Sequence, residues 1–192
     1  MDSFREDTLA VQQYPVSSKR AFEVIVRRYM KDAYFIALGL VGNREDALDL
    51  SQEAFARAYR NLKHFNKDGH FFPWFYRILR NLCFSHLRKR RHERRLVVER
   101  SDGADIAADA GDCFAPDMVA ERNETKDRVW AAIGRLDEKH REVIILRHFR
   151  NLSYEQIAET LMCNKGTVTS RLYYARKRLK EILESEKGGR QA

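Results

Sequence analysis

Apolar residues recur along this chain at spacings of three and four, the period that places side chains on one face of an α-helix. This pattern predicts helices over residues 18–40, 44–63 and about 72–91, and two more around residues 129–136 and 143–149. No segment alternates apolar and polar residues for long enough to form a convincing strand. The sequence therefore predicts an all-α protein.

The most informative pattern lies in residues 153–180, which predict two short helices joined by a turn. Ser153 with Gln156 has the sequence of a capping box for the first helix, and Asn164 is suited to cap the second. No acidic residue interrupts residues 165–180, which hold six Lys and Arg. The pattern is typical of a helix–turn–helix, whose second helix enters the major groove of DNA. An ordinary helical hairpin with a solvated basic face is the competing interpretation.

Composition divides the chain into two helical domains. An N-terminal segment (1–17) precedes a three- or four-helix bundle at residues 18–95, where Gly39 and Gly42 are expected to end the first helix. Residues 96–123 predict an acidic, flexible linker, because apolar groups are too few there to offset the entropy of ordering. Residues 124–186 form the second domain, and residues 187–192 a disordered tail.

Charge and cysteine content restrict the classes of protein to which this chain can belong. The 192-residue chain carries a net charge of +8, which favours a polyanionic partner such as nucleic acid. No run of 18 apolar residues and no signal-peptide pattern occur, so we expect a cytoplasmic protein without membrane insertion. Three widely separated cysteines (Cys83, Cys113 and Cys163) argue against a disulfide framework.

The motifs of common enzyme and metal sites do not occur. The chain has no phosphate-binding glycine loop, no GxSxG and no HExxH. Cys83 and His86 lie one helical turn apart, but two ligands do not make a zinc site. We therefore expect a protein that is not an enzyme, with no catalytic residues, no cofactor and no metal.

Two blocks of sequence resemble one family. Residues 43–55 (NREDALDLSQEAF) and 72–81 (FPWFYRILRN) resemble conserved region 2 of bacterial sigma factors. Residues 136–147 (LDEKHREVIILR) together with 166–171 (GTVTSR) resemble region 4. Their order and spacing are similar to the extracytoplasmic-function (ECF) group, which has these two domains and little else. The resemblance implies an RNA polymerase specificity subunit that recognises promoter −10 and −35 elements.

An acidic strip follows one side of the helix at residues 44–63. Such a strip would repel DNA, so it suits a protein partner that carries Arg or Lys. The resemblance implies docking on the clamp helices of the polymerase β′ subunit, and part of residues 143–149 is expected to touch the β flap. A solvated helix face is the alternative. The predicted polymerase-binding residues are Asp46, Asp49, Gln52 and Glu53.

The helix at residues 72–91 combines basic groups with aromatic residues, which can hold phosphates and stack unpaired bases. The aromatics are Phe71, Trp74, Phe75, Tyr76 and Phe84, of which Trp74 and Phe75 are more consistent with the core. The resemblance places −10 reading on this helix and in the preceding loop, and Ser85 departs from the acid usual in the family. The predicted −10 residues are Lys67, Arg77, Arg80, Asn81, Ser85, His86 and Arg88.

The second helix of the helix–turn–helix lies where the resembling family reads the −35 element. Arginine pairs well with guanine, small hydroxyl residues accept several partners, and helix starts suit phosphate. The predicted −35 residues are Tyr154, Thr167, Thr169, Ser170, Arg171, Tyr173, Tyr174 and Arg176.

The partners expected from the resemblance are core RNA polymerase, promoter DNA and an inhibitory anti-sigma factor. The linker either threads through the polymerase toward the RNA exit path or is only a tether. The main competing function is a stand-alone helix–turn–helix regulator whose first domain senses a ligand or dimerises. An RNA-binding helical protein is disfavoured, because no RRM-, KH- or OB-like strand pattern occurs.

Overall fold

The computed structural model describes residues 19–66, 69–100 and 124–188. This part of the chain contains seven α-helices, one short 3₁₀ turn and no strand, so the predicted all-α class is confirmed. The first half comprises α2 (Lys19–Val41), α3 (Arg44–Asn61), η1 (Leu62–His64) and α4 (Phe71–Arg100). The second half comprises α5 (Glu124–Gly134), α6 (Glu138–His148), α7 (Tyr154–Leu161) and α8 (Lys165–Gly188).

Local capping determines where these helices begin. The Asn43 side chain caps α3 by accepting a hydrogen bond from the Asp46 amide at 3.0 Å. Gly42, with a φ of 77°, makes the sharp turn between α2 and α3, as glycine does at low cost. Asp137 caps α6 in the same way as Asn43, by accepting from the His140 amide at 3.0 Å. These short turns hold consecutive helices side by side.

The first half encloses an aromatic core. The rings of Phe55 and Phe75 lie 4.5 Å apart, and Tyr29 lies 5.4 Å from Phe71. Phe71, Phe75 and Tyr29 are all buried. Aromatic pairs at these separations stabilise a core beyond the area they bury.

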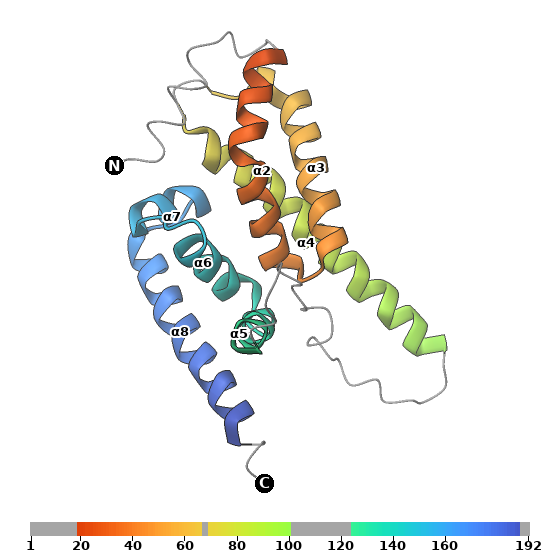
Figure 1. Ribbon diagram of the computed structural model, residues 1–192, viewed down its shortest axis with the longest axis vertical. Helices are drawn as coiled ribbons and strands as arrows, with labels where there is room; N and C mark the ends of the chain where they lie inside the picture. The colour runs from red at the N-terminus through yellow and green to blue at the C-terminus, as the bar shows by residue number, and fades with distance from the viewer. Residues whose placement is uncertain (1–18, 67–68, 101–123, 189–192) are drawn as a thin grey trace.

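The two halves pack against each other through α2 with α5 and α6, and through α4 with α7 (Figure 1). Gly39, which the sequence placed at the end of a helix, instead lies inside α2. A Cβ atom at Gly39 would lie 2.8 Å from Ile145 Cδ1 of α6, so the glycine permits close approach of the two helices. The halves therefore share one continuous region of buried residues.

Two helices extend past their expected ends. The α4 helix reaches Arg100 rather than about residue 91, so residues 96–100 of the predicted linker are helical. Residues 92–100 contain Arg, Glu and Leu, which favour helix, and Lys89 Nζ in the preceding turn lies 3.8 Å from Glu93 Oε1. The α8 helix reaches Gly188, so residues 187 and 188 of the predicted tail are helical. The predicted N-terminal segment and the remainder of the linker lie outside the described residues.

Candidate nucleic-acid and polymerase-binding surfaces

The helix–turn–helix has the local structure that the sequence predicts. The Ser153 side chain accepts from the Gln156 amide, and the Gln156 side chain accepts from the Ser153 amide, so the capping box of α7 is complete. Met162 turns the chain with a left-handed φ of 53°. Asn164 Oδ1 accepts from the Thr167 amide at 2.7 Å and caps the start of α8. The turn therefore holds α8 in a defined orientation on α7.

Five of the predicted −35 residues form an outward face of α8. Val168, Leu172 and Ala175 are fully buried on the inner side of this helix. Tyr173 and Tyr174 are 64% and 56% exposed, large values for aromatic side chains. The other exposed members are Thr169, Ser170 and Arg176, whereas Thr167 and Arg171 are half-buried.

The hydroxyl groups on this face are already used as donors. Thr169 Oγ1 donates to the Lys165 carbonyl at 3.0 Å, and Ser170 Oγ donates to the Thr167 carbonyl at 3.0 Å. Thr167 Oγ1 donates to Asn164 Oδ1 at 2.8 Å. In this arrangement each hydroxyl oxygen can still accept a hydrogen bond, which suits amino groups on DNA bases better than phosphate oxygens.

Tyr154 supports the helix–turn–helix as well as bordering it. Its half-buried ring lies 5.5 Å beneath the Arg147 guanidinium, which donates to the Leu152 carbonyl at 2.8 Å. Lys165 forms an ion pair with Glu155 of α7, and hydrogen bonding by this lysine lowers the pKa of Glu155 to about 2. The basic character of this face therefore comes from its arginines more than from Lys165.

His148 lies beside this basic surface, and the sequence interpretation missed it. Burial, followed by the charges of Arg176 and Arg147, lowers the pKa of His148 below its ordinary value. Because Arg147 belongs to α6 and Arg176 to α8, the two helices contribute to one positive region around His148. No local sequence signal connects residues 148 and 176.

The predicted −10 surface divides along α4. Asn81, Ser85 and Arg88 are exposed, and Arg88 Nη2 donates to Ser85 Oγ at 3.2 Å. Asn81 offers both a donor and an acceptor to solvent, as base recognition requires. Lys67 lies outside the described residues. This exposed part of α4 is free to meet DNA.

The other part of α4 faces the second half of the protein. Arg80 forms an ion pair with Glu142 of α6, in which Arg80 Nη2 and Glu142 Oε2 lie 3.3 Å apart. Tyr76 donates to Glu142 Oε1 at 2.9 Å. Arg77 Nη1 lies 3.1 Å from the Met162 sulfur in the turn after α7. Arg77 and Arg80 are thus engaged within the protein.

The aromatic residues beside the −10 helix are not a stacking surface. Phe71, Tyr76 and Phe84, which the sequence placed beside the DNA-reading groups, are buried in the core. Phe75 is also buried and Trp74 is half-buried, as the core interpretation predicted for them. The helices α2, α3 and α7 all pack against α4, so the aromatic side chains of α4 are covered on several sides.

The acidic strip of α3 is less acidic than its sequence suggests. Asp49 and Gln52 are exposed, but Glu53 pairs with Arg57 at 2.7 Å, and that hydrogen bond lowers the pKa of Glu53. Leu48 is 49% exposed beside Asp49, outside the buried stripe of the helix. The strip is therefore a mixed acidic and apolar surface, and Leu48 is a component that the sequence interpretation missed.

Asp46 belongs to the contact between α3 and α4. Its Oδ2 atom lies 3.0 Å from Arg90 Nη1 and 3.1 Å from His86 Nε2. A predicted polymerase-binding residue and a predicted −10 residue, His86, therefore meet each other inside the first half. Asp46 and His86 therefore join α3 to α4, between the predicted polymerase-binding and −10 residues.

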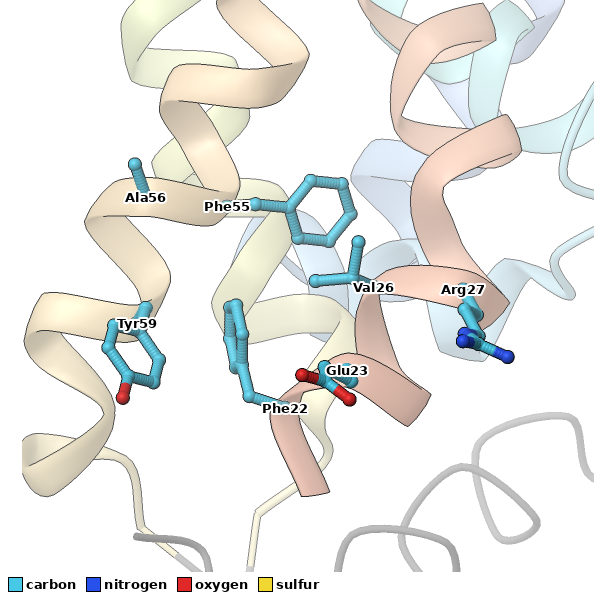
Figure 2. A pocket seen from close by; sticks show the side chains of 7 residues that line it. All are labelled: Phe22, Glu23, Val26, Arg27, Phe55, Ala56 and Tyr59. Carbon is cyan, nitrogen blue, oxygen red and sulfur yellow. The ribbon is translucent and has the colours of Figure 1, made fainter. Parts of the chain in front are cut away.

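An apolar groove of about 440 Å³ lies between α2 and α3, next to the acidic strip. Figure 2 shows Phe22 and Val26 of α2 beside Phe55 and Tyr59 of α3. The exposed edge of Tyr59 brings the groove to within two helical turns of Gln52. The surface that carries the predicted polymerase-binding residues therefore adjoins an apolar groove.

Among the described residues, no three His, Cys, Asp or Glu side chains gather closely enough to hold a metal ion. Burial raises the pKa of the Cys83 thiol to about 12. Within the same residues, every helix is too short or too polar to cross a bilayer.

Comparison with known proteins identifies the family. The model of Sigma-70 region 2 matches residues 25–93, and the model of Sigma-70 region 4 matches residues 126–179. The chain is 32% identical to the RNA polymerase sigma-H factor of Pseudomonas aeruginosa, over 93% of this chain and 94% of that protein. It is 31% identical to the ECF RNA polymerase sigma factor SigW of Bacillus subtilis, over 90% and 94%. The chain belongs to the ECF sigma factors.

A solved structure of a sigma factor agrees with this assignment, and a second solved structure shows the same fold. The sigma factor RpoE of Bartonella quintana, solved with the anti-sigma factor NepR, has a TM-score of 0.66 and 29% identity, covering 85% of this chain and 96% of that one. CnrH, solved with the cytosolic domain of CnrY, has a TM-score of 0.67 and 22% identity, covering 93% and 97%. As an ECF sigma factor, the protein directs promoter-specific initiation by RNA polymerase.

Proposed function

We propose that the two halves of this sigma factor read two separate promoter elements. The observation that carries the proposal is the exposed face of α8, where two tyrosines and Arg176 project from a firmly buried inner stripe. Arg171 and Arg176 donate to guanine edges or phosphates of the −35 duplex, and the hydroxyls of Thr169 and Ser170 accept from base amino groups. Tyr173 and Tyr174 pack against the walls of the groove.

The exposed part of α4 captures the melted −10 strand. Asn81 contacts an unpaired base through its amide, and Arg88, held beside Ser85 at 3.2 Å, binds the adjoining phosphate. Arg77 and Arg80 join this surface when they leave their partners in the second half. Their charges then bind the strand backbone, which makes capture dependent on salt.

The mixed surface of α3 docks on core polymerase. Asp49 and Gln52 supply exposed polar groups for basic residues of the β′ clamp helices, and Leu48 supplies apolar contact at the centre. Part of α6 near its C-terminus approaches the β flap. Polymerase binding aligns both DNA-reading surfaces on one promoter.

An anti-sigma factor controls this cytoplasmic protein. The relative RpoE of Bartonella quintana was solved with the anti-sigma factor NepR, which supports a protein inhibitor of the same class here. The surfaces described act by binding rather than by catalysis. A stand-alone regulator would bind promoter duplex tightly without polymerase, and that behaviour discriminates the competing function.

Permanganate footprinting of a promoter bound by reconstituted holoenzyme tests the −10 assignment. Asn81→Ala should weaken opening-dependent thymine reactivity in the −10 region while leaving polymerase binding intact. Lys63→Ala, an exposed change beyond the end of α3, is the control and should behave as the unmodified chain. Equal footprints from Asn81→Ala and the control would remove Asn81 from the −10 surface.

A further inference from the structure

We propose that Glu142 is an intramolecular clasp that holds the two halves closed and withholds Arg80 from the −10 strand until polymerase opens the chain. This inference rests on the proposed function, because it concerns the regulation of the −10 surface. Its central observation is a carboxylate from the −35 half bound to a predicted −10 arginine.

The position and contacts of Glu142 suit a residue that holds the two halves together. The residue is 1% exposed, whereas the Arg80 side chain is 37% exposed and lies at the edge of the contact. Tyr76 donates to the carboxylate at 2.9 Å, and Arg80 reaches both of its oxygens through two guanidinium nitrogens. Burial acts to lower the pKa of Arg80, but the hydrogen bond and charge of Glu142 outweigh it and raise that pKa. A two-point arginine–carboxylate contact is among the stronger polar interactions in proteins.

Further contacts between the halves surround the clasp. Arg150 Nη1 lies 2.9 Å from Asp32 Oδ2 of α2, and its guanidinium lies 4.8 Å from the Phe72 ring. Arg141 Nη1 donates to the Leu40 carbonyl at 2.7 Å. These contacts align the two halves around the clasp, and Glu142 is the carboxylate of the second half that holds Arg80.

Closure covers the two DNA-reading surfaces unequally. Arg77 and Arg80 on α4 both contact the second half, and His70 Nε2 at the start of α4 lies 3.9 Å from Glu159 Oε1 of α7. The tyrosines of α8 stay exposed in the same structure. The closed chain therefore presents its −35 face while part of its −10 face is engaged.

The closed chain cannot read both elements at once. Elements named for positions 10 and 35 are about 25 base pairs apart, or about 85 Å along B-form DNA. The α4 helix is about 45 Å long at 1.5 Å per residue, and α7 packs directly against it. Promoter recognition therefore requires the halves to separate, and a DNA phosphate then replaces Glu142 as the partner of Arg80.

A reversible covalent lock tests this inference in the full chain. The variant carries Gly39→Cys and Ile145→Cys, with Cys113→Ser and Cys163→Ser to remove two native thiols. A Cβ atom at residue 39 would lie 3.0 Å from Ile145 Cγ1, so the two new thiols are close enough to bond. Oxidised glutathione converts the two thiols into a disulfide and is itself reduced. We expect the oxidised chain to lose about tenfold or more of its promoter-specific initiation with core polymerase, and dithiothreitol to restore it.

The outcomes separate the two proposals. If the reduced chain also fails to initiate, the proposed function is wrong. If the reduced chain initiates and the locked chain initiates equally well, opening is not required and the clasp inference is overturned. Wild-type chain carried through the same oxidation and reduction reports any redox effect on polymerase.

The contribution of Glu142 is measured by the rate at which this disulfide forms in the free chain. Glu142→Gln keeps the shape and an acceptor for Tyr76 but removes the charge that holds Arg80, so we expect disulfide formation to slow by about tenfold. Glu184→Gln on the exposed side of α8 is the matched control and should leave the rate unchanged. An equal rate for Glu142→Gln and the control would refute the clasp.

Discussion

The ion pair between Asp32 and Arg150 makes a quantitative test of whether the halves are packed together in solution. Asp32 belongs to α2 of the first half, and Arg150 follows α6 of the second half. Asp32→Asn and Arg150→Met remove one charge each and keep much of the side-chain volume. A double-mutant cycle of these two changes isolates the energy of their interaction.

The structure sets the expected size of this coupling. The Arg150 side chain is 16% exposed and that of Asp32 is 29% exposed, with 2.9 Å between the charged atoms. Fully exposed pairs contribute up to about 1 kcal/mol, and breaking buried pairs costs about 3–5 kcal/mol, so a coupling of about 1–2 kcal/mol is expected here. Arg150→Met alone should cost about 1 kcal/mol more, because the guanidinium also lies over the rings of Tyr29 and Phe72.

Urea unfolding followed by tryptophan fluorescence measures this coupling. The sequence has two tryptophans, Trp74 in the first half and Trp130 in the second, so single Trp→Phe variants report each half separately. We expect both probes to show the same transition and the same loss in each mutant. Additive effects of the two substitutions, within about 0.3 kcal/mol, would show that the halves do not pack together as described.

Three further predictions concern the second half. Ser153→Ala should lower the free energy of unfolding by about 1 kcal/mol, because it removes a helix cap. Ser185→Ala removes only a hydrogen bond to the Ile182 carbonyl and should not lower it. Equal losses in the two variants would refute the capping argument. Burial and two neighbouring arginines lower the pKa of His148, so the stability of the fold should be full above about pH 6.5 and fall as the pH drops through that lowered pKa. His148→Asn should therefore flatten the dependence of the urea midpoint on pH between about pH 7 and pH 5. An unchanged dependence would contradict this prediction. Arg171→Ala should weaken binding to the −35 sequence by about 1–3 kcal/mol in a holoenzyme assay, and an equal loss on every DNA sequence would assign Arg171 to phosphate.

The sequence predicts the helices well where local chemistry determines them. The stripe of Val168, Leu172 and Ala175 on α8 is buried as its spacing requires. The capping box at Ser153 and the cap at Asn164 form because their partners lie three residues away. The family resemblance, confirmed by both region models, also follows from contiguous blocks of residues.

Features that depend on residues far apart in the chain could not be predicted from the sequence. Glu142 is buried because Tyr76 and Arg80, 66 and 62 residues earlier, meet it across the two halves. Gly39 lies within α2, where the missing side chain permits the close approach of α6. No periodicity within one helix reports such contacts, so the closed arrangement and the divided −10 surface required the three-dimensional structure. The roles of the individual DNA- and polymerase-binding residues stay predictions.

Run-off transcription with purified core polymerase tests the central claim most directly. Templates should come from a genomic library of the source bacterium, with core enzyme free of other sigma factors. We predict discrete transcripts that start at fixed positions only when this chain is added and that are reduced by Asn81→Ala or Arg171→Ala. Template-independent or absent initiation with the folded chain would contradict the account.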